Sequence, residues 1–316
     1  MPDLLKTALP DTIDLLNKEQ QGCMDALSEL FDGAAAYLFM PRKTLTPRIV
    51  GDYYEDLRAK YGERNDKLVV LVDSGGGDIH TAFNLDKLFR RYGEEQLIFV
   101  VPRWAKSAAT LMVCGGDRIL MSPVAELGPI DPQITQYNEL EQRLETFSPL
   151  HLESTLDLIR EEFRAGEDRL AEALTKRLQF PLTLGSIRKS LDVGSKYLEM
   201  LLSTRMLKDS DEAPECVTEA CNKLTEGYSD HGFCIDCDEA QRLGLLAEEL
   251  QGEALETVWR IYLLHNKRLD VRKKEKSKEM EERIKKLPPE LLKQLPDLDQ
   301  LLRPDDEESE SSKGGY

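Results

Sequence analysis

The sequence has few histidines, an excess of acidic over basic residues, and no long apolar run. Its 316 residues include four histidines, so few side chains are suited to acid–base chemistry near neutral pH. The formal net charge of −17 argues against nucleic acid as the main partner, because phosphate binding needs a basic surface. No apolar run approaches the roughly 18 residues that a membrane span needs. The start, MPDLLKTALPD, has neither a basic region nor an apolar core, so we expect no secretion signal, no membrane partner and a cytoplasmic location.

The composition is that of a soluble globular protein with a heavily charged surface. Apolar residues make up 41% of the chain and charged residues 32%. The length suffices for one large domain or two modest ones, with a substantial core. Six cysteines in a chain that we expect to be cytoplasmic predict free thiols rather than a disulfide framework.

Strand and helix patterns alternate over the first half of the chain, which predicts βαβ units and a parallel sheet in an α/β fold. Thr46 and Pro47 are expected to be the N-cap and first residue of a helix. The predicted strands lie at 34–40, in KLVVLV from residue 67, at 97–101 and at 118–123, and the predicted helices at 46–60, at 79–92 and from Ser107.

Composition also divides the chain. From about 138 to 212 it becomes charged and periodic, including LEQRLETF. We expect a mostly helical insertion there, with helices that form subunit contacts. We predict a helical lead-in over 1–33, a core in two parts over 34–137 and 213–266, the insertion over 138–212, a charged helical extension over 267–302, and an acidic disordered tail over 303–316.

Two motifs carry the chemistry, because catalysis by a nucleophile needs a nucleophile, a base and donors for the oxyanion. DSGGGD at 73–78 ends a strand with glycines that turn sharply and aim N–H groups outward. It lacks the Gly-Lys-Ser/Thr of a nucleotide P-loop. WAKSAATLMVCGG places Ser107 at the start of an apolar helix, whose dipole favours negative charge there. On its own, Ser107 is either a helix cap or a nucleophile.

The two motifs together resemble the Clp/crotonase superfamily. A glycine loop about 30 residues before a small-residue helix that a serine begins, with strands between, resembles the Clp protease subunit and signal peptide peptidase A. The span 34–250 is most similar to the serine dehydrogenase proteinase family, on these motifs, ILMSPVAELGPIDPQ and LTEGYSDHGFCIDCDEAQRLGL. The resemblance implies a ββα-superhelix with a parallel sheet and a homo-oligomer. It also implies an oxyanion hole of the Gly76 and Ala108 N–H groups, with Gly75 and Gly77 binding substrate.

The position of the base departs from the Clp pattern. Where Clp proteases have histidine, about 25 residues after the serine, this chain has Asp131, and where they have aspartate it has His231. Because a triad is defined by geometry and roles, the two residues can be exchanged, with His231 as base and Asp131 as its orienting partner. A serine–lysine dyad is the alternative. Lys106 should point away from Ser107, whereas Lys189 and Lys196 reach the site if the insertion folds over it.

Four late cysteines compete with this assignment for His231. The candidate ligands are Cys216, Cys221, Cys234, Cys237 and His231, up to five soft ligands in 22 residues. A structural zinc site is therefore an alternative interpretation of this segment. Against zinc, FCIDCDEA has the pattern of a strand that enters a helix, and a spacing of five on a helix converges poorly. We therefore expect no metal and no other cofactor.

The function predicted from sequence is an ATP-independent serine peptidase, a hydrolase that cleaves peptides or unfolded proteins through an acyl-enzyme on Ser107. A crotonase-type acyl-CoA enzyme is the first alternative, since it shares the fold and the oxyanion hole but needs no serine. Arg103 and Lys106 would then supply basic groups for CoA. A catalytically inactive scaffold, with the charged helices and acidic tail as its working surface, is the second alternative.

Overall fold

The computed structural model describes residues 9–41, 44–131, 134–138, 142–147, 149–177, 184–208, 213–228 and 230–286. The chain forms two compact units. The larger comprises Leu27–Glu256, and the smaller comprises Met1–Ala26 together with Thr257–Tyr316. No helix among the described residues has the length and apolar content to cross a membrane.

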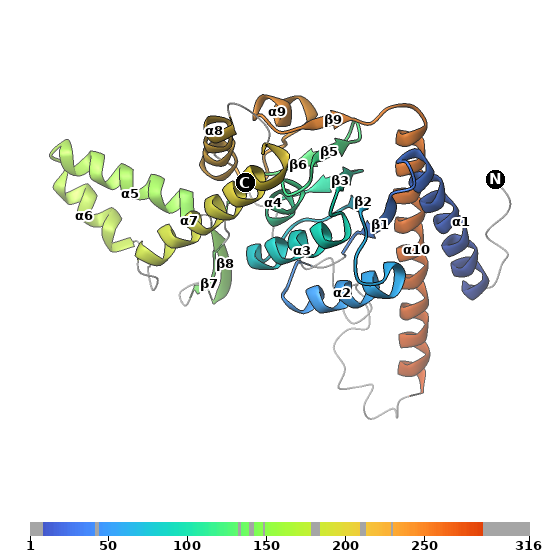
Figure 1. Ribbon diagram of the computed structural model, residues 1–316. Coiled ribbons are helices and arrows are strands. Elements are labelled where there is room, and N and C mark those ends of the chain that lie inside the picture. Colours follow the sequence, from blue (N-terminus) through green and yellow to red (C-terminus); the bar gives the residue numbers. More distant parts are fainter. Residues whose placement is uncertain are drawn as a thin grey trace. The chain divides into compact units, whose positions relative to one another are not determined.

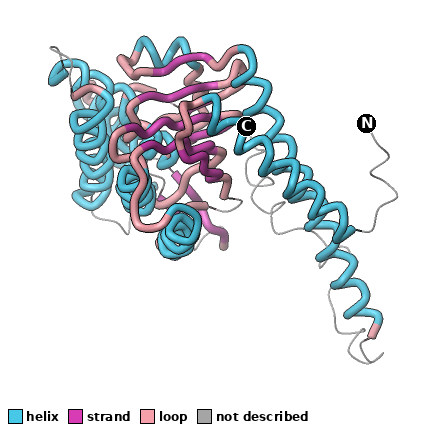
Figure 2. Tube along the Cα trace, turned by 45° about the vertical axis from the view of Figure 1, so that its right-hand side comes forward, coloured by secondary structure: helices cyan, strands magenta, loops and turns pink. Residues whose placement is uncertain are grey.

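The larger unit is built on a parallel sheet of five strands, in the order β1-β2-β3-β5-β9 (Figures 1 and 2). This confirms the predicted α/β class with a parallel sheet. The strands are β1 (Ala35–Phe39), β2 (Lys67–Val72), β3 (Gln96–Val101), β5 (Arg118–Met121) and β9 (Ala247–Glu249). In β2 and β3 every residue after the first is buried. Nearly continuous apolar strands such as KLVVLV are typical of parallel sheets that are covered on both faces.

Three helices connect the first four strands of the sheet. They are α2 (Arg48–Tyr61), α3 (Ile79–Tyr92) and α4 (Ala108–Val113). Asp78 begins α3, where its side chain accepts the Thr81 N–H. Pro47, rather than Thr46, occupies the N-cap of α2, so the prediction for these two residues is wrong by one position. The reason is a preceding tight turn, which the Ile49 N–H closes on the Thr46 carbonyl.

Buried groups fix the end of α4 against α3 and β3. Gly115 and Gly116 follow the helix, where a Cβ on Gly115 would lie 1.8 Å from the Asp86 carboxylate. A Cβ on Gly116 would lie 2.7 Å from the ring of Phe99. The Gly-Gly that ends the apolar run is therefore a close-packing requirement, and it holds the helix that Ser107 precedes.

Short segments after the main strands pair into a second ladder. β4 (Trp104–Ala105) pairs in parallel with β6 (Glu126–Leu127). Isolated bridges extend the ladder on both sides, because Leu45 pairs with Gly77, Ser74 with Ala105, and Leu127 with Ile235. The ladder therefore joins the glycine loop, the residues before Ser107 and the segment that follows His231.

The segment between β6 and β9 is an excursion of mostly helices. It contains a two-stranded hairpin, β7 (Ile134–Asn138) and β8 (Arg143–Phe147), whereas the pattern of LEQRLETF predicts helix. That prediction is wrong because antiparallel pairing with ITQYN outweighs local helical propensity. Helices α5 and α6 lie side by side, and α7 leads back to α4 and α8 (Figure 1). The helices are α5 (Pro149–Arg164), α6 (Asp168–Arg177), α7 (Leu184–Leu201), the π-helix η1 (Leu202–Met206) and α8 (Ala213–Glu226).

The final elements are α9 (Cys237–Arg242), β9 and α10 (Gly252–Lys285). In FCIDCDEA the expected strand reduces to the single bridge at Ile235, directly before α9. Helix α10 runs without a break from residue 252, so the charged extension expected from 267 continues an existing helix. In the smaller unit, α10 pairs with α1 (Leu9–Leu30) through an ion pair between Arg260 and Glu19. The acidic tail predicted at 303–316 lies outside the described residues.

Candidate active site

Ser107 lies between β4 and α4 with a strained backbone. Its φ is 54° and its ψ is −122°, and its side chain makes no capping hydrogen bond to the helix. A capping serine would have an extended backbone and would accept an N–H of the first turn. A residue with a side chain adopts positive φ only at a cost of about 1–3 kcal/mol, and such strain clusters at functional sites. The side-chain cap, one of the two interpretations of Ser107, does not fit this geometry.

The glycine loop packs directly against Ser107. Gly76 has a φ of 92°, and a Cβ built on it would lie 2.5 Å from the Lys106 carbonyl oxygen. The same Cβ would lie 3.0 Å from Cβ of Ser107 and 3.1 Å from the amide nitrogen of Ala108. No side chain fits at residue 76. The structure thus brings Ser107 together with Gly76 and Ala108, the two residues that the resemblance implies as oxyanion donors.

The two predicted oxyanion donors differ in their present partners. The Gly76 N–H donates to Oγ of the buried Ser74 at 3.2 Å. Within the described part of the chain, the Ala108 N–H, at the first turn of α4, has no acceptor. An oxyanion beside Ser107 would therefore find one open donor and one that must first leave Ser74.

The other two loop glycines have different surroundings. Gly75 is exposed, with no atom within 4 Å of its ideal Cβ position. Gly77 packs against Leu45, because a Cβ there would lie 2.4 Å from the Leu45 nitrogen. Gly75 is accessible for the substrate contact predicted for both glycines, whereas the contacts of Gly77 are those of a structural glycine.

His231 and Asp131, which are 100 residues apart in the chain, form a close pair. Nδ1 of His231 contacts Oδ1 of Asp131. The Asp131 side chain is 4% exposed, whereas that of His231 is 36% exposed. A carboxylate at Nδ1 holds a neutral imidazole in the tautomer whose Nε2 accepts a proton. Among the described residues no hydrogen bond joins Ser107 to His231, so the pair and the serine are two separate groups in this conformation.

Backbone pairing holds these two groups at the same edge of the sheet. Ile235, four residues after His231, exchanges two backbone hydrogen bonds with Leu127, at 2.8 and 3.1 Å. β6, which contains Leu127, pairs with β4 just before Ser107. In α4, Oγ1 of the buried Thr110 lies 2.6 Å from the Ala105 carbonyl and accepts the Gly128 N–H at 3.1 Å. These contacts connect the segment that follows His231 to the residues on either side of Ser107.

Lys106 points away from Ser107, toward Glu126. Its Nζ lies 2.9 Å from Oε2 of Glu126 and donates to the carbonyl oxygens of Leu127 and Phe233. Arg103 binds the same carboxylate at 2.6 Å. Hydrogen bonds from Lys106 and then from Arg103 lower the pKa of Glu126 to about 2. Sequence analysis missed Glu126, because a single acid on a two-residue strand gives no pattern.

Asp73, the first residue of the glycine motif, is a second group that sequence analysis missed. Its Oδ1 accepts the Trp104 N–H at 3.0 Å. Burial raises the pKa of Asp73 to about 6, against smaller lowering effects of the Trp104 hydrogen bond and of Arg103. This carboxyl group joins the glycine loop to β4.

Helix α7 packs beside the site. Gly194 lies against the Ile130 carbonyl and the Ile79 side chain, which are 3.7 and 3.4 Å from its ideal Cβ position. Tyr197 stacks on Phe83 with ring centroids 4.0 Å apart, and its hydroxyl lies 3.0 Å from Nδ1 of His80. The insertion does therefore fold against the core near the site. Of the two lysines considered as alternative bases, Lys196 is exposed, and the side chain of Lys189 is outside the described residues.

The late cysteines lie in different environments. Cys221 and Cys237 are buried, Cys216 is half-buried and Cys234 is exposed. In the described part of the chain, no group of three or more His, Cys, Asp or Glu side chains is arranged to hold a metal ion. His231, the fifth candidate ligand, has its Nδ1 on Asp131.

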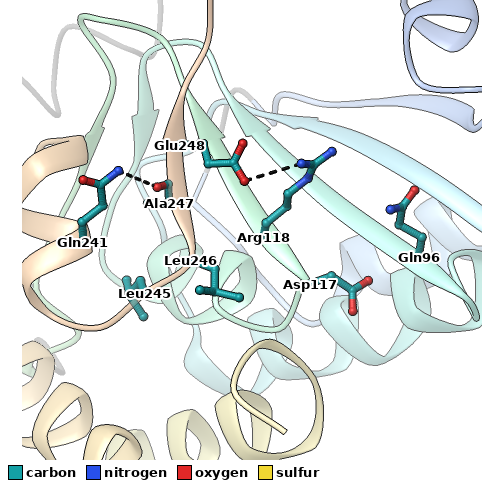
Figure 3. Close-up of a pocket in the computed structure, with 8 residues that line it drawn as sticks. All are labelled: Gln96, Asp117, Arg118, Gln241, Leu245, Leu246, Ala247 and Glu248. Carbon is teal, nitrogen blue, oxygen red and sulfur yellow. Dashed lines mark hydrogen bonds and ion pairs between the residues drawn. The ribbon is translucent and has the colours of Figure 1, made fainter. Parts of the chain in front are cut away.

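A pocket of about 460 Å³ lies elsewhere, at the amino ends of the strands (Figure 3). Ser107 and the glycine loop are at the carboxyl ends, so this pocket is not part of the candidate active site. Two of its lining residues, Arg118 and Glu248, form an ion pair at 3.5 Å. The pocket is lined by Gln96, Asp117, Arg118, Gln241, Leu245, Leu246, Ala247 and Glu248.

Comparisons with known proteins give distant similarities. The chain matches no protein-family model. It is similar to two uncharacterised proteins of Methanocaldococcus jannaschii, with 25% identity over 215 residues (67% of this chain and 65% of the relative) and 23% identity over 198 residues (62% and 57%). The chain thus covers less than two thirds of the length of each relative.

Among solved structures, the chain is similar to a serine-to-alanine mutant of 1510-N, a membrane-bound stomatin-specific protease. The identity is 12% and the TM-score 0.40, and the match covers 69% of this chain and 80% of that one. A likeness this low carries no argument about fold or function. The interpretation of the site therefore depends on its own geometry.

Proposed function

We propose that this chain is a serine hydrolase of the Clp-like peptidase type, which cleaves peptides through an acyl-enzyme on Ser107. The observation that carries the proposal is the strained Ser107, with Gly76 packed against both its side chain and the free N–H of Ala108. The same edge of the sheet holds the His231–Asp131 pair. Nucleophile, donors and a histidine with an orienting carboxylate are the parts that acyl transfer needs.

The second ladder supports a ββα-superhelix as the fold. Each turn of such a fold would contribute one strand to the main sheet and one short segment to a second ladder. The pairings of Leu45 with Gly77, Ser74 with Ala105 and Trp104 with Glu126 have this arrangement.

The proposed reaction assigns one step to each group. Ser107 Oγ attacks the scissile carbonyl carbon while Nε2 of His231 takes its proton, and Asp131 stabilises the resulting imidazolium. The Gly76 and Ala108 N–H groups bind the oxyanion. The imidazolium then protonates the leaving amine, and water deacylates Ser107 by the same route in reverse. His231 must approach Ser107 for this, and Gly76 must exchange Ser74 for the substrate oxygen.

The acyl-CoA alternative loses its support at Arg103 and Lys106. Both cations bind Glu126, so neither is free to pair with the phosphates of CoA. We therefore propose a peptide substrate. We further propose a homo-oligomer, which light scattering on the purified protein would detect.

A fluorophosphonate probe tests the proposal without knowledge of the substrate. An activated serine displaces fluoride from phosphorus, and peptide mass spectrometry locates the new Ser–O–P bond. We expect the adduct on Ser107, its loss in Ser107→Ala, and labelling that is slower by at least about 100-fold in His231→Ala and Asp131→Asn. Ser203→Ala, at an exposed serine of η1, is the matched control and should label normally.

Two results would contradict the proposal. Absence of an adduct on the folded wild-type protein would show that Ser107 is not an activated nucleophile. An adduct that forms at the wild-type rate in both the His231 and Asp131 variants would show that Ser107 is a nucleophile without this triad, and would favour a lysine base.

A further inference from the structure

Lys106 directly precedes Ser107, and its side chain contacts the loop that contains His231. It is 18% exposed, and its ammonium group contacts three acceptors. These are Oε2 of Glu126 at 2.9 Å and the carbonyl oxygens of Leu127 at 3.1 Å and Phe233 at 3.4 Å. A lysine ammonium has three N–H groups, so each has one acceptor.

The third acceptor belongs to a tight turn around His231. The Phe233 N–H donates to the Asp230 carbonyl, and the Gly232 N–H to the Asp230 carboxylate. The ring of Phe233 stacks on Tyr228, with centroids 4.4 Å apart. A cation that binds the Phe233 carbonyl therefore contacts the turn that contains His231.

The main chain of Lys106 contacts the other half of the site. Its N–H donates to the Ser74 carbonyl at 3.0 Å, and its own carbonyl lies against Gly76. Gly128 makes room for the side chain, since a Cβ there would lie 2.7 Å from Cδ of Lys106. One residue thus contacts the oxyanion loop with its backbone and the histidine loop with its side chain.

We propose that Lys106 is a positioning residue that fixes the His231 loop relative to Ser107, an inference that rests on the proposed hydrolase function. It is not the base, because Glu126 and two carbonyls occupy its ammonium and hold it away from Ser107. Glu126 acts with it: the carboxylate orients the ammonium, and Arg103 binds its second side.

Saturation kinetics of fluorophosphonate labelling measure the effect of Lys106→Met, which keeps most of the length of the side chain and removes its charge. We expect the maximal labelling rate to fall by about 10- to 100-fold, since an error of about 1 Å in placing a catalytic group costs up to 100-fold, and the half-saturating probe concentration to stay unchanged. Lys60→Met removes a matched lysine from an exposed ion pair with Asp56 and should have no effect.

A double-mutant cycle with His231→Ala separates positioning from general destabilisation. If Lys106 acts through His231, Lys106→Met should have less than about a threefold effect when His231 is absent. An equal loss in both backgrounds, or no loss in either, would overturn the proposal. Labelling that is abolished by Lys106→Met but survives in His231→Ala would identify Lys106 as the base and would also overturn it.

Hydrogen exchange tests the loop independently of activity. Lys106→Met should accelerate exchange of the Phe233 and Ile235 amides, and Lys60→Met should not. If the wild-type protein fails to label Ser107 but this acceleration occurs, the hydrolase proposal fails and the positioning contact stands. If the wild-type labels and Lys106→Met changes neither exchange nor rate, the positioning proposal fails alone. Glu126→Gln, which keeps the shape and weakens the ion pair, should act in the same direction if Lys106→Met does not fold.

Discussion

Gly76 shows how strictly the site constrains single residues. Its φ of 92° and the carbonyl of Lys106, 2.5 Å from an ideal Cβ, both exclude a side chain. Neighbouring Gly75 has a backbone that other residues adopt, and open space around its Cβ position. The two glycines are adjacent in sequence, yet only one is required by the packing against Ser107.

We predict that Gly76→Ala lowers the free energy of unfolding by at least about 1–3 kcal/mol, from the positive φ alone, and abolishes fluorophosphonate labelling of Ser107. Gly75→Ala should change the free energy of unfolding by no more than about 0.5 kcal/mol, as is usual for surface substitutions, and should leave Ser107 able to react with the probe. Urea denaturation and probe labelling of the two variants measure the difference. Equal effects of the two substitutions would contradict the packing shown for residue 76.

The sequence predicted these residues unequally. The Gly-rich loop and Ser107 are recognisable because the glycines interrupt an apolar strand and the serine interrupts an apolar run. Asp131 and His231 could be paired only through the resemblance to the Clp pattern, since nothing local relates residues 100 apart. Lys106, Glu126 and Asp73 act through contacts with residues of other segments, which no spacing along the chain encodes.

Among the elements, η1 depends on buried charge. Arg205 donates from Nε to Asp117 at 2.9 Å and from Nη2 to the carbonyls of Gly93 and Glu94. Arg90, on α3, binds Thr204 and the Leu201 carbonyl. Two arginine side chains thus fasten the end of the insertion to the core.

We predict that Arg205→Met lowers the free energy of unfolding by about 2–4 kcal/mol, because Oδ1 of Asp117 and the carbonyls of Gly93 and Glu94 lose their donor. Oδ2 of Asp117 keeps the Leu97 N–H. Arg160→Met breaks an ion pair with Asp157 in which both side chains are about two-thirds exposed, and should cost less than about 0.5 kcal/mol. Chemical denaturation of both variants tests this. A loss below about 1 kcal/mol in Arg205→Met would show that η1 is held by packing alone.

Elements were predicted best where one periodicity dominates. α3 spans the expected 79–92, and β2 and β3 coincide with apolar β-branched runs. The β7–β8 hairpin was not predicted, because RLETF has no turn signal of its own and becomes a strand only by pairing with Ile134–Asn138. The π-helical turn η1 likewise follows from tertiary ion pairs rather than from local propensity.

The whole molecule combines a net charge of −17 with buried carboxyl groups in its larger unit. Burial raises the pKa of Asp73 to about 6 and that of Asp86, which is 0% exposed, to about 7. Between the ordinary value of 3.8 and these raised values, the folded protein binds more protons than the unfolded chain, so stability falls as pH rises. The lowered pKa of Glu126 has the opposite effect, but only in the window from about 2 to 4.5.

We therefore predict that the free energy of unfolding decreases from about pH 5.5 to about pH 7.5, by a few kcal/mol at about 1.4 kcal/mol per unit of pKa shift. Self-repulsion of the acidic chain acts in the same direction, and added salt should weaken that part alone.

Asp73→Asn keeps an oxygen for the Trp104 N–H and removes the charge, so at about pH 7.5 it should stabilise the protein by about 1–2 kcal/mol and flatten the pH dependence. Asp157→Asn, at an exposed aspartate, is the matched control and should do neither. Urea denaturation at several pH values, in low and high salt, would separate the two contributions. A rise in stability with pH over this range would mean that the two buried carboxyl groups are ionised in the folded protein at no cost, and that the contacts of Asp73 and Asp86 favour charge more than burial opposes it.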